Sequence, residues 1–231
     1  MMKRSNMPNF WPISRKNRKY VVRPIPGPHS KETAIPLGVL IRDVFSLARN
    51  MNEVKKILNT GKIEVNGRIC RKYSMPVGLM DVMNIGDDVY RMVPSSKGLK
   101  PIQVNDGKER ILKIKNKSLI GKEVIQLNMF NGYNMLVKKD EYSTGDSLLV
   151  DNKTGSIKKH IKFDKGVLVV VVSGTNIGKI GKVEQIHPSK NMQPSTLTVS
   201  VDGDKILVPK RYVLVIGEDK SAVEIEVKKD E

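Results

Sequence analysis

The apolar residues between positions 37 and 58 follow the spacing of helix faces. They are Leu37, Leu40, Ile41, Val44, Leu47, Ala48, Met51, Val54, Ile57 and Leu58. Recurrence every three or four positions indicates amphipathic helices. Asn50 and Asn52 interrupt the pattern as typical N-cap residues, and Gly61 is typical of a helix C-terminus. The pattern therefore predicts two helices with a break near Arg49 to Asn52.

After Gly61 the apolar period changes from a helical one to two. Residues 62–65 and 68–70 alternate between polar and apolar types, and Asn66-Gly67 separates them. An Asn-Gly pair between two alternating runs is the strongest short-range signal of a β-hairpin. We therefore expect a small two-helix plus hairpin domain over residues 37–103.

Residues 104–165 consist of short alternating runs that are separated by turn residues at 130–132 and 152–155. No run of helical length has a 3.6-residue period, so this region predicts a small antiparallel β domain. Lysines are frequent in it and are expected on its exposed face. They are Lys113, Lys115, Lys117, Lys138, Lys139, Lys158 and Lys159. Solvated strand faces are often rich in lysine, so this pattern alone does not decide whether they contact a ligand.

Residues 166–217 begin with the longest apolar run, 167–172, and continue with strand patterns around an expected turn at Asp202-Gly203. These strands suffice for a small SH3-like barrel. A phosphate-binding nucleotide loop is disfavoured, because the spacing from Gly174 to Gly178 is one residue short and Ile180 replaces the required hydroxyl. The predicted fold is thus mixed and mostly β, with a mixed-charge tail over 218–231.

The chain is strongly basic, with 41 Lys and Arg against 24 Asp and Glu, a net charge of +17 and a pI near 9.9. The excess lies toward the N-terminus, because residues 1–40 carry 8 basic and 1 acidic residue whereas 166–231 carry 9 of each. Residues 1–36 are also rich in proline, and we expect an extended leader that is ordered only by a polyanionic partner. A solvated tail and a mitochondrial presequence are the alternatives, and early prolines oppose the presequence helix.

Several classes of protein are disfavoured by what the sequence lacks. One cysteine, Cys70, excludes a disulfide framework, and the six-residue apolar run is too short to cross a bilayer. His29, His160 and His187 have no metal-ligand spacing. We therefore expect a cytoplasmic protein with no metal, no cofactor, no membrane association and no small-molecule substrate.

Three stretches resemble known families. Residues 48–89 resemble the RNA-binding domain first described in bacterial small-subunit ribosomal protein four, which also occurs in pseudouridine synthases and tyrosyl-tRNA synthetases. The run KKILNTGKIEVNGRICRKYSMPVGLMDV, 55–82, is more particular and resembles the archaeal and eukaryotic small-subunit ribosomal proteins of the e-type four family, as does VIQLNMFNGYNMLV at 124–137. Residues 173–188 resemble the KOW motif of ribosomal proteins and transcription elongation factors.

The resemblance implies a structural constituent of the small ribosomal subunit, of archaeal type, that binds and stabilises small-subunit rRNA beside neighbouring ribosomal proteins. An RNA-modifying enzyme is the main alternative, but it needs a separate α/β catalytic domain, and residues 104–231 predict two small β units. A transcription elongation regulator is the third possibility, against which the module at 37–93 argues. We expect no catalytic residue.

The candidate RNA contacts are cations that the predicted elements leave pointing away from the apolar faces, because phosphates are neutralised by Lys and Arg. They are Arg15, Lys16, Arg18, Lys19, Arg23, Arg49, Lys55, Lys56, Lys62, Arg68, Arg71, Lys72, Lys179 and Lys182.

Overall fold

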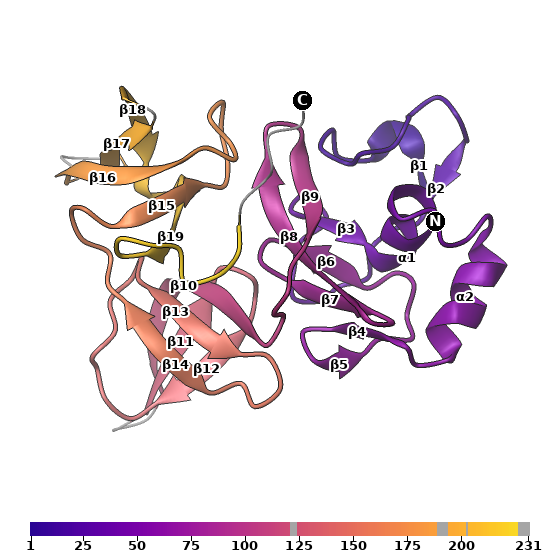
Figure 1. Cartoon of the computed structure of the whole chain (residues 1–231), viewed down its shortest axis with the longest axis horizontal. Helices are drawn as coiled ribbons and strands as arrows, with labels where there is room; N and C mark the ends of the chain where they lie inside the picture. The colour runs from indigo at the N-terminus through magenta and orange to yellow at the C-terminus, as the bar shows by residue number, and fades with distance from the viewer. Residues whose placement is uncertain (121–123, 189–193, 202, 226–231) are drawn as a thin grey trace. The chain divides into compact units, whose positions relative to one another are not determined.

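The computed structural model describes residues 1–120, 124–188, 194–201 and 203–225, and they form two compact units. Unit 1 comprises Met1–Val93 and Lys97–Lys108, and unit 2 comprises Pro94–Ser96 and the described residues from Glu109 onward (Figure 1). The prediction of a mixed, mostly β fold is confirmed. The finer division at residues 36, 103, 165 and 217 stays a prediction.

Unit 1 combines short helices with antiparallel strands. Its elements are β1 (Met2–Lys3), a 3-10 helix (Arg4–Asn6), β2 (Tyr20–Val21), β3 (Ala34–Pro36), α1 (Leu37–Val39), a π-helix (Leu40–Val44), α2 (Met51–Asn59), β4 (Ile63–Val65), β5 (Arg68–Ile69), β6 (Pro76–Gly78), β7 (Val82–Ile85), β8 (Asp88–Ser95) and β9 (Gly98–Gln103). The largest sheet has the order β5-β4-β7-β8-β9, and β1-β2 and β3-β6 form two-stranded sheets.

The second predicted helix and the hairpin are confirmed in detail. The Asn50 side chain accepts hydrogen bonds from the backbone N–H groups of Asn52 and Glu53, both at 3.0 Å, and so caps α2. Gly61 follows the helix with φ of 75°, the left-handed conformation expected after a helix C-terminus. Asn66 and Gly67 both have positive φ, as a two-residue type I′ turn between β4 and β5 requires.

The first predicted helix is shorter than its pattern indicates, and part of it is wound as a wider π-helix. It consists of α1 and the π-helix, in which the Phe45 N–H donates to the Leu40 carbonyl across five residues at 2.8 Å. Ser46, with φ of 55°, then ends the helical path. Residues 37–41 are buried on every side, so tertiary packing rather than a single amphipathic face determines their conformation.

The N-terminal segment packs on the core of unit 1. This corrects the expectation that residues 1–36 are an extended leader that only a polyanionic partner orders. Met7, Trp11, Val21 and Val22 belong to the same apolar cluster as the two helices. The Trp11 side chain is 3% exposed, and its indole N–H donates to the Ala34 carbonyl at 3.0 Å. Large residues dispersed among prolines have no periodicity, but they bury enough apolar surface to order this segment.

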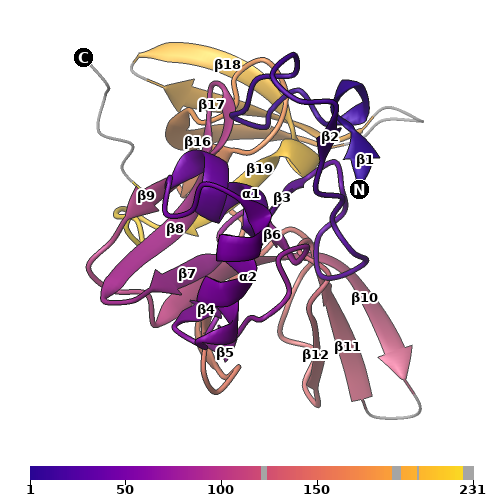
Figure 2. The same cartoon turned by 90° about the vertical axis from the view of Figure 1, so that its right-hand side faces the viewer.

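Unit 2 begins with a five-stranded antiparallel sheet of order β12-β11-β10-β13-β14. Its strands are β10 (Glu109–Ile120), β11 (Val124–Met129), β12 (Asn134–Val137), β13 (Ser147–Asp151) and β14 (Ile157–Ile161). The first half of β10 pairs with β13 and the second half with β11, with a register shift between Ile114 and Asn116. Figure 2 shows β10, β11 and β12 as neighbouring strands. Bulges of this kind bend and twist a strand, so one long strand serves both halves of the sheet.

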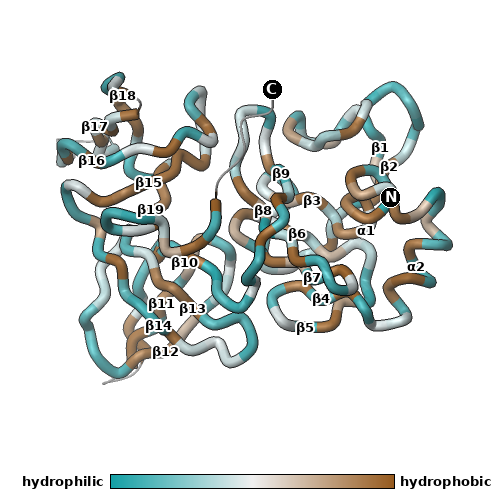
Figure 3. Tube along the Cα trace, in the orientation of Figure 1, coloured by the Kyte–Doolittle hydropathy of each residue, from teal (hydrophilic) through white to brown (hydrophobic). Residues whose placement is uncertain are grey.

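The second part of unit 2, where the sequence predicts a small barrel, is a curled antiparallel sheet of order β18-β17-β16-β15-β19, which we call the barrel although its edge strands β18 and β19 are not paired with each other among the described residues. Its elements are β15 (Leu168–Val171), β16 (Ile180–His187), β17 (Thr196–Val201), β18 (Asp204–Pro209), a 3-10 helix (Lys210–Tyr212) and β19 (Val213–Gly217). Figure 3 shows the hydrophobic stretch of β15 in brown, and its valines lie in the barrel core. In the predicted β17–β18 turn, Asp202 lies outside the described residues.

One lysine of the central sheet is engaged inside unit 2 rather than displayed on its surface. Lys113, which the sequence places on an exposed face, is only partly accessible, and its ammonium donates to the carbonyls of Lys210 at 2.9 Å and Val213 at 2.5 Å. Burial and the nearby Lys210 charge lower the pKa of Lys113 to about 8. The expectation for Lys113 is therefore wrong, because this side chain joins the first sheet to the end of the barrel.

Candidate nucleic-acid interface

One side of helix α2 faces the core, and the other side carries exposed cations. Val54 and Leu58 are fully buried, whereas Lys55 and Lys56 are exposed. Figure 3 shows the corresponding alternation of brown and teal segments along α2. Because the N-terminus of the helix is fixed by the Asn50 cap, the direction of both lysines is set by the backbone.

The loop after the hairpin brings further cations next to α2. The Lys55 ammonium lies 5.4 Å from the ring centroid of Tyr73, and the Tyr73 carbonyl accepts the Gly38 N–H at 2.7 Å. These contacts hold the loop between the two helices. We use the name helix–hairpin surface for the exposed cations of α2, the hairpin and this loop. They are Arg49, Lys55, Lys56, Lys62, Arg68, Arg71 and Lys72.

The predicted cations of the N-terminal segment form a second exposed set, which we call the N-terminal set. Its members are Arg15, Lys16, Arg18, Lys19 and Arg23. Arg15 also stabilises its own loop, because its guanidinium donates to the Met7 carbonyl at 2.8 Å and to the Asn9 side chain. Its positive charge nevertheless remains accessible, since no acidic partner neutralises it among the described residues.

The electrostatic property that these two sets share is the absence of an acidic partner. None of the twelve cations makes an ion pair within the described part of the chain. Arg42, which lies in the π-helix outside both sets, is bound by Asp43 at 2.7 Å. The twelve charges therefore remain available to phosphates, which attract unpaired surface cations from solution.

Lys179 and Lys182 belong to unit 2, whereas both sets belong to unit 1. Both are exposed, but the Lys182 ammonium pairs with the Asp219 carboxylate at 3.2 Å. Lys179 follows Gly178, whose N–H donates to the Val171 carbonyl at 2.8 Å and closes the turn between β15 and β16. Of the two barrel candidates, only Lys179 has an unpaired charge among the described residues.

The sequence did not indicate that His29 and Asp81 position the hairpin. The His29 ring and the Asp81 carboxylate are buried and lie 2.8 Å apart, and Asp81 also accepts hydrogen bonds from the Gly78 N–H at 2.9 Å and the Asn66 side chain at 2.8 Å. Burial raises the pKa of Asp81, but His29 and these hydrogen bonds together hold it below its usual value. The carboxylate thus fixes the hairpin turn relative to the N-terminal segment.

The described residues offer little for catalysis. They contain no group of three or more His, Cys, Asp or Glu side chains that is suited to holding a metal ion. Burial raises the pKa of the Cys70 thiol, which opposes a role as nucleophile. In the same parts of the chain, every helix is too short or too polar to pass through a lipid bilayer.

Comparison with known proteins agrees with this arrangement. Residues 86–157 match the family model described as Ribosomal family S4e, and residues 2–32 match the RS4NT (NUC023) domain. The small ribosomal subunit protein eS4 of Methanothermobacter thermautotrophicus is 37% identical over 230 residues, which cover 97% of this chain and 95% of the relative. The protein of the same name from Archaeoglobus fulgidus is 38% identical over 231 residues and 97% of each chain.

A solved structure supports the fold independently. The crystal structure of the 30S ribosomal protein S4e from Thermoplasma acidophilum superposes with a TM-score of 0.70, at 24% identity, over 80% of this chain and 96% of that one. Fold, exposed cations and relatives together define a ribosomal protein. The chain belongs to the ribosomal S4e family.

Proposed function

We propose that this chain is a structural constituent of the small ribosomal subunit, which binds and stabilises small-subunit rRNA in the cytoplasm and performs no catalytic step. The observation that carries the proposal is the set of twelve exposed cations of unit 1 that make no ion pair with any residue the structure describes. Close relatives over nearly the whole length are named as small-subunit proteins, which supports the same conclusion.

The physical mechanism is neutralisation of phosphates on folded RNA. Each phosphate contact releases condensed counterions, and this release drives association and makes it sensitive to salt. The helix–hairpin surface is rigid, since Asn50 caps its helix and the Asp81 network fixes its turn. A rigid array of charges suits a folded RNA, which proteins recognise largely by its shape and backbone.

The N-terminal set extends the contact beyond the helix–hairpin surface. Trp11 and the neighbouring buried residues hold this segment on unit 1, so its cations are presented from a folded loop. Less conformational entropy is then lost on binding than with a disordered tail. Neighbouring small-subunit proteins are further partners in this proposal, and Lys179 of the barrel is an additional rRNA contact.

The test is sedimentation of a cell extract through a density gradient before and after a high-salt wash. We expect the chain to remain with the small subunit in a stoichiometric amount, because many phosphate contacts act together. Release by the wash, or sedimentation as a free protein, would contradict the proposal. Assays for RNA modification and for association with RNA polymerase would then test the two alternative functions.

A further inference from the structure

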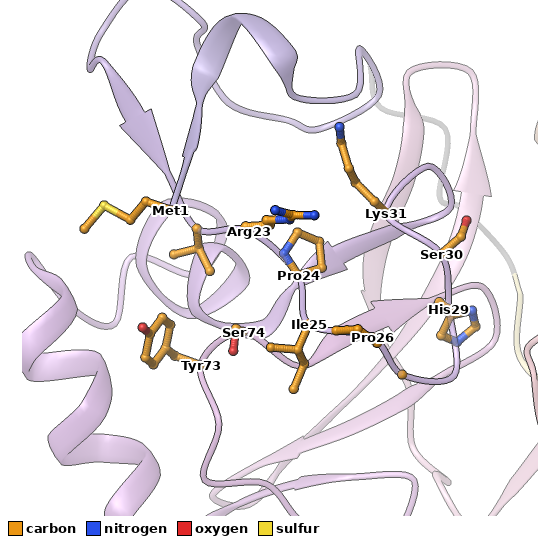
Figure 4. A pocket seen from close by; sticks show the side chains of 12 residues that line it. Met1, Arg23, Pro24, Ile25, Pro26, His29, Ser30, Lys31, Tyr73 and Ser74 are labelled. Carbon is orange, nitrogen blue, oxygen red and sulfur yellow. The ribbon is translucent and has the colours of Figure 1, made fainter.

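Unit 1 contains a pocket of about 730 Å³ beside the two cationic sets (Figure 4). Residues 22–31 form most of its wall, and Tyr73 and Ser74 of the loop after the hairpin close the other side. Ligand pockets in proteins typically have volumes of about 300 to 1,000 Å³. The pocket is therefore large enough for a small organic group.

The pocket is held in place by contacts between segments that are distant in sequence. The Ile25 N–H donates to the Ser74 carbonyl at 3.0 Å, which ties the N-terminal segment to the loop. At the other end of the wall, the His29 ring is fixed by Asp81 at 2.8 Å. Between them Gly27 lies against Pro76, where an added Cβ would be only 3.0 Å from the proline ring. The walls are thus largely preformed.

The chemical groups around the pocket combine apolar surface, one aromatic ring and two cations. Figure 4 shows Tyr73, Ile25 and Ser74 near one another, with the charged ends of Arg23 and Lys31 on the far side of Pro24. Neither cation has an acidic partner among the described residues, and neither the Tyr73 nor the Ser74 hydroxyl has a hydrogen-bond partner there. A planar, polar-edged ring with an attached phosphate would match these groups.

We propose that this pocket receives one unstacked nucleotide of the bound RNA. The base stacks on the Tyr73 ring among the apolar residues, and its phosphate lies between Arg23 and Lys31. Proteins recognise nucleotides that leave the RNA stack in this way, by aromatic or guanidinium stacking and hydrogen bonds to base edges. The inference rests on the proposed function and specifies how unit 1 engages one nucleotide.

The position of the pocket favours a nucleotide of an RNA strand over a free nucleotide. Arg23 belongs to the N-terminal set, and Tyr73 contacts Lys55 of the helix–hairpin surface. A strand that follows both sets therefore passes the mouth of the pocket. A free nucleotide would have only Arg23 and Lys31 for its phosphate, because none of the pocket residues belongs to a helix of eight or more residues whose N-terminus could bind it.

The test compares two substitutions of the same residue in the full-length chain. Tyr73→Leu keeps an apolar wall but removes the ring, whereas Tyr73→Phe keeps the ring and removes only the hydroxyl. We expect Tyr73→Leu to weaken binding to purified small-subunit rRNA by about tenfold without changing the salt dependence, and Tyr73→Phe to bind nearly as the parent chain does. Lys62→Ala is the matched control, and should lower the salt slope instead.

A second measurement does not depend on the variants. Ultraviolet crosslinking of intact small subunits, followed by mass spectrometry, should give a nucleotide adduct on the peptide that contains Tyr73. Normal rRNA binding by Tyr73→Leu, or no adduct at Tyr73 while other peptides are crosslinked, would overturn the pocket assignment and leave the proposed function intact. If the parent chain does not bind rRNA, the proposed function itself fails.

The same chain is also titrated with AMP, CMP, GMP and UMP to separate the two sources of a nucleotide. We expect no saturable binding below millimolar concentration, because a monophosphate lacks the adjoining backbone contacts. Micromolar binding of one of them that is lost in Tyr73→Leu, without an rRNA adduct at Tyr73, would overturn the inference in favour of a small-molecule site.

Discussion

In unit 1 the exposed cations of the candidate interface have no acidic partners among the described residues, whereas in unit 2 many exposed lysines lie against carboxylates. Lys158 is 2.7 Å from Glu109, and Lys205 is 2.8 Å from Glu184, and Lys182 and Lys159 have similar partners. Both units are rich in lysine, so composition alone does not distinguish them. The surroundings of a lysine, rather than its exposure alone, therefore indicate whether it is available to a polyanion.

The exposed ion pairs of unit 2 affect the surface potential more than the stability of the fold. An exposed ion pair contributes only about 0 to 1 kcal/mol to folding, so these pairs do little for stability. They do, however, reduce the positive potential of the surface, since each carboxylate cancels a neighbouring charge. The paired lysines of unit 2 are therefore weaker candidates for contact with a polyanion than the unpaired cations of unit 1.

The contrast between the cations of the two units depends most on the N-terminal segment being part of folded unit 1. Trp11→Ala should lower the free energy of unfolding by about 3 to 5 kcal/mol, because it removes a buried aromatic side chain and its hydrogen bond to Ala34. Denaturant unfolding of the free protein measures this loss. Lys19→Ala, an exposed change in the same segment, should alter stability by less than about 0.5 kcal/mol.

Deletion of residues 1–30 gives the stronger form of this test. It removes Trp11 and two buried valines, so the remaining chain should melt at a much lower temperature. A melting temperature equal to that of the full chain would show that the segment is an independent tail, and the N-terminal set would then not be presented from a folded loop.

The next largest effect concerns the salt dependence of rRNA binding. It compares four unpaired cations of unit 1 with four paired lysines of unit 2. Replacing Lys55, Lys56, Arg68 and Arg71 with Ala should lower the slope of log K against log salt for rRNA binding by about 0.7 to 0.9 per lost phosphate contact. The control replaces Lys139, Lys158, Lys159 and Lys205, which are paired in unit 2. We expect the control to change the slope far less, and equal slopes for the two variants would refute the contrast.

The smallest effect concerns the dependence of stability on pH. Unit 1 contains the pair His29–Asp81 and unit 2 the pair His160–Asp146. For Asp146, burial raises the pKa, but backbone hydrogen bonds from Phe163 and Ser143 together with His160 hold it below the usual value, as the His29 network does for Asp81. A carboxylate with a lowered pKa stabilises the fold above its unfolded pKa of about 3.9, and this stabilisation is lost as pH falls further.

The stability of the chain should therefore decrease as the pH is lowered through about 4, and Asp81→Asn and Asp146→Asn should each make the decrease less steep. Denaturant midpoints between pH 7 and pH 3 measure this slope. Because both carboxylates are buried and both have a lowered pKa, we expect a change of the same sign in the two variants. A slope unchanged by both variants would show that other carboxylates determine the acid response.

The elements that local interactions determine could be predicted from the sequence. Asn50 caps α2 through groups two and three residues away, and Asn66-Gly67 form a turn that needs only their own backbone freedom. The packing of Trp11 against Ala34 spans 23 residues and follows no period, so the sequence pattern gave no indication of it. The same holds for the π-helix at Leu40–Val44, which tertiary contacts impose.

In the candidate site, too, the exposure of the charged residues could be predicted, but their contacts with residues distant in sequence could not. All fourteen predicted cations are exposed, because charged residues beside apolar periodic positions point away from a core. Their partners could not be predicted, since Lys182 meets Asp219 from 37 residues further along the chain. The role proposed for Tyr73 could not be predicted from the sequence, because it depends on the pocket that residues 22–31 form opposite it.

Lys113 also limits how this chain can be divided. The KOW-like segment is a portable sequence motif, yet the carbonyls at Lys210 and Val213 are bound by an ammonium group from a strand about a hundred residues earlier. A fragment cut before residue 166 would leave these acceptors without their donor. Gene shuffling that exchanged the barrel alone would meet the same penalty, so the two β parts of unit 2 should be inherited and transplanted together.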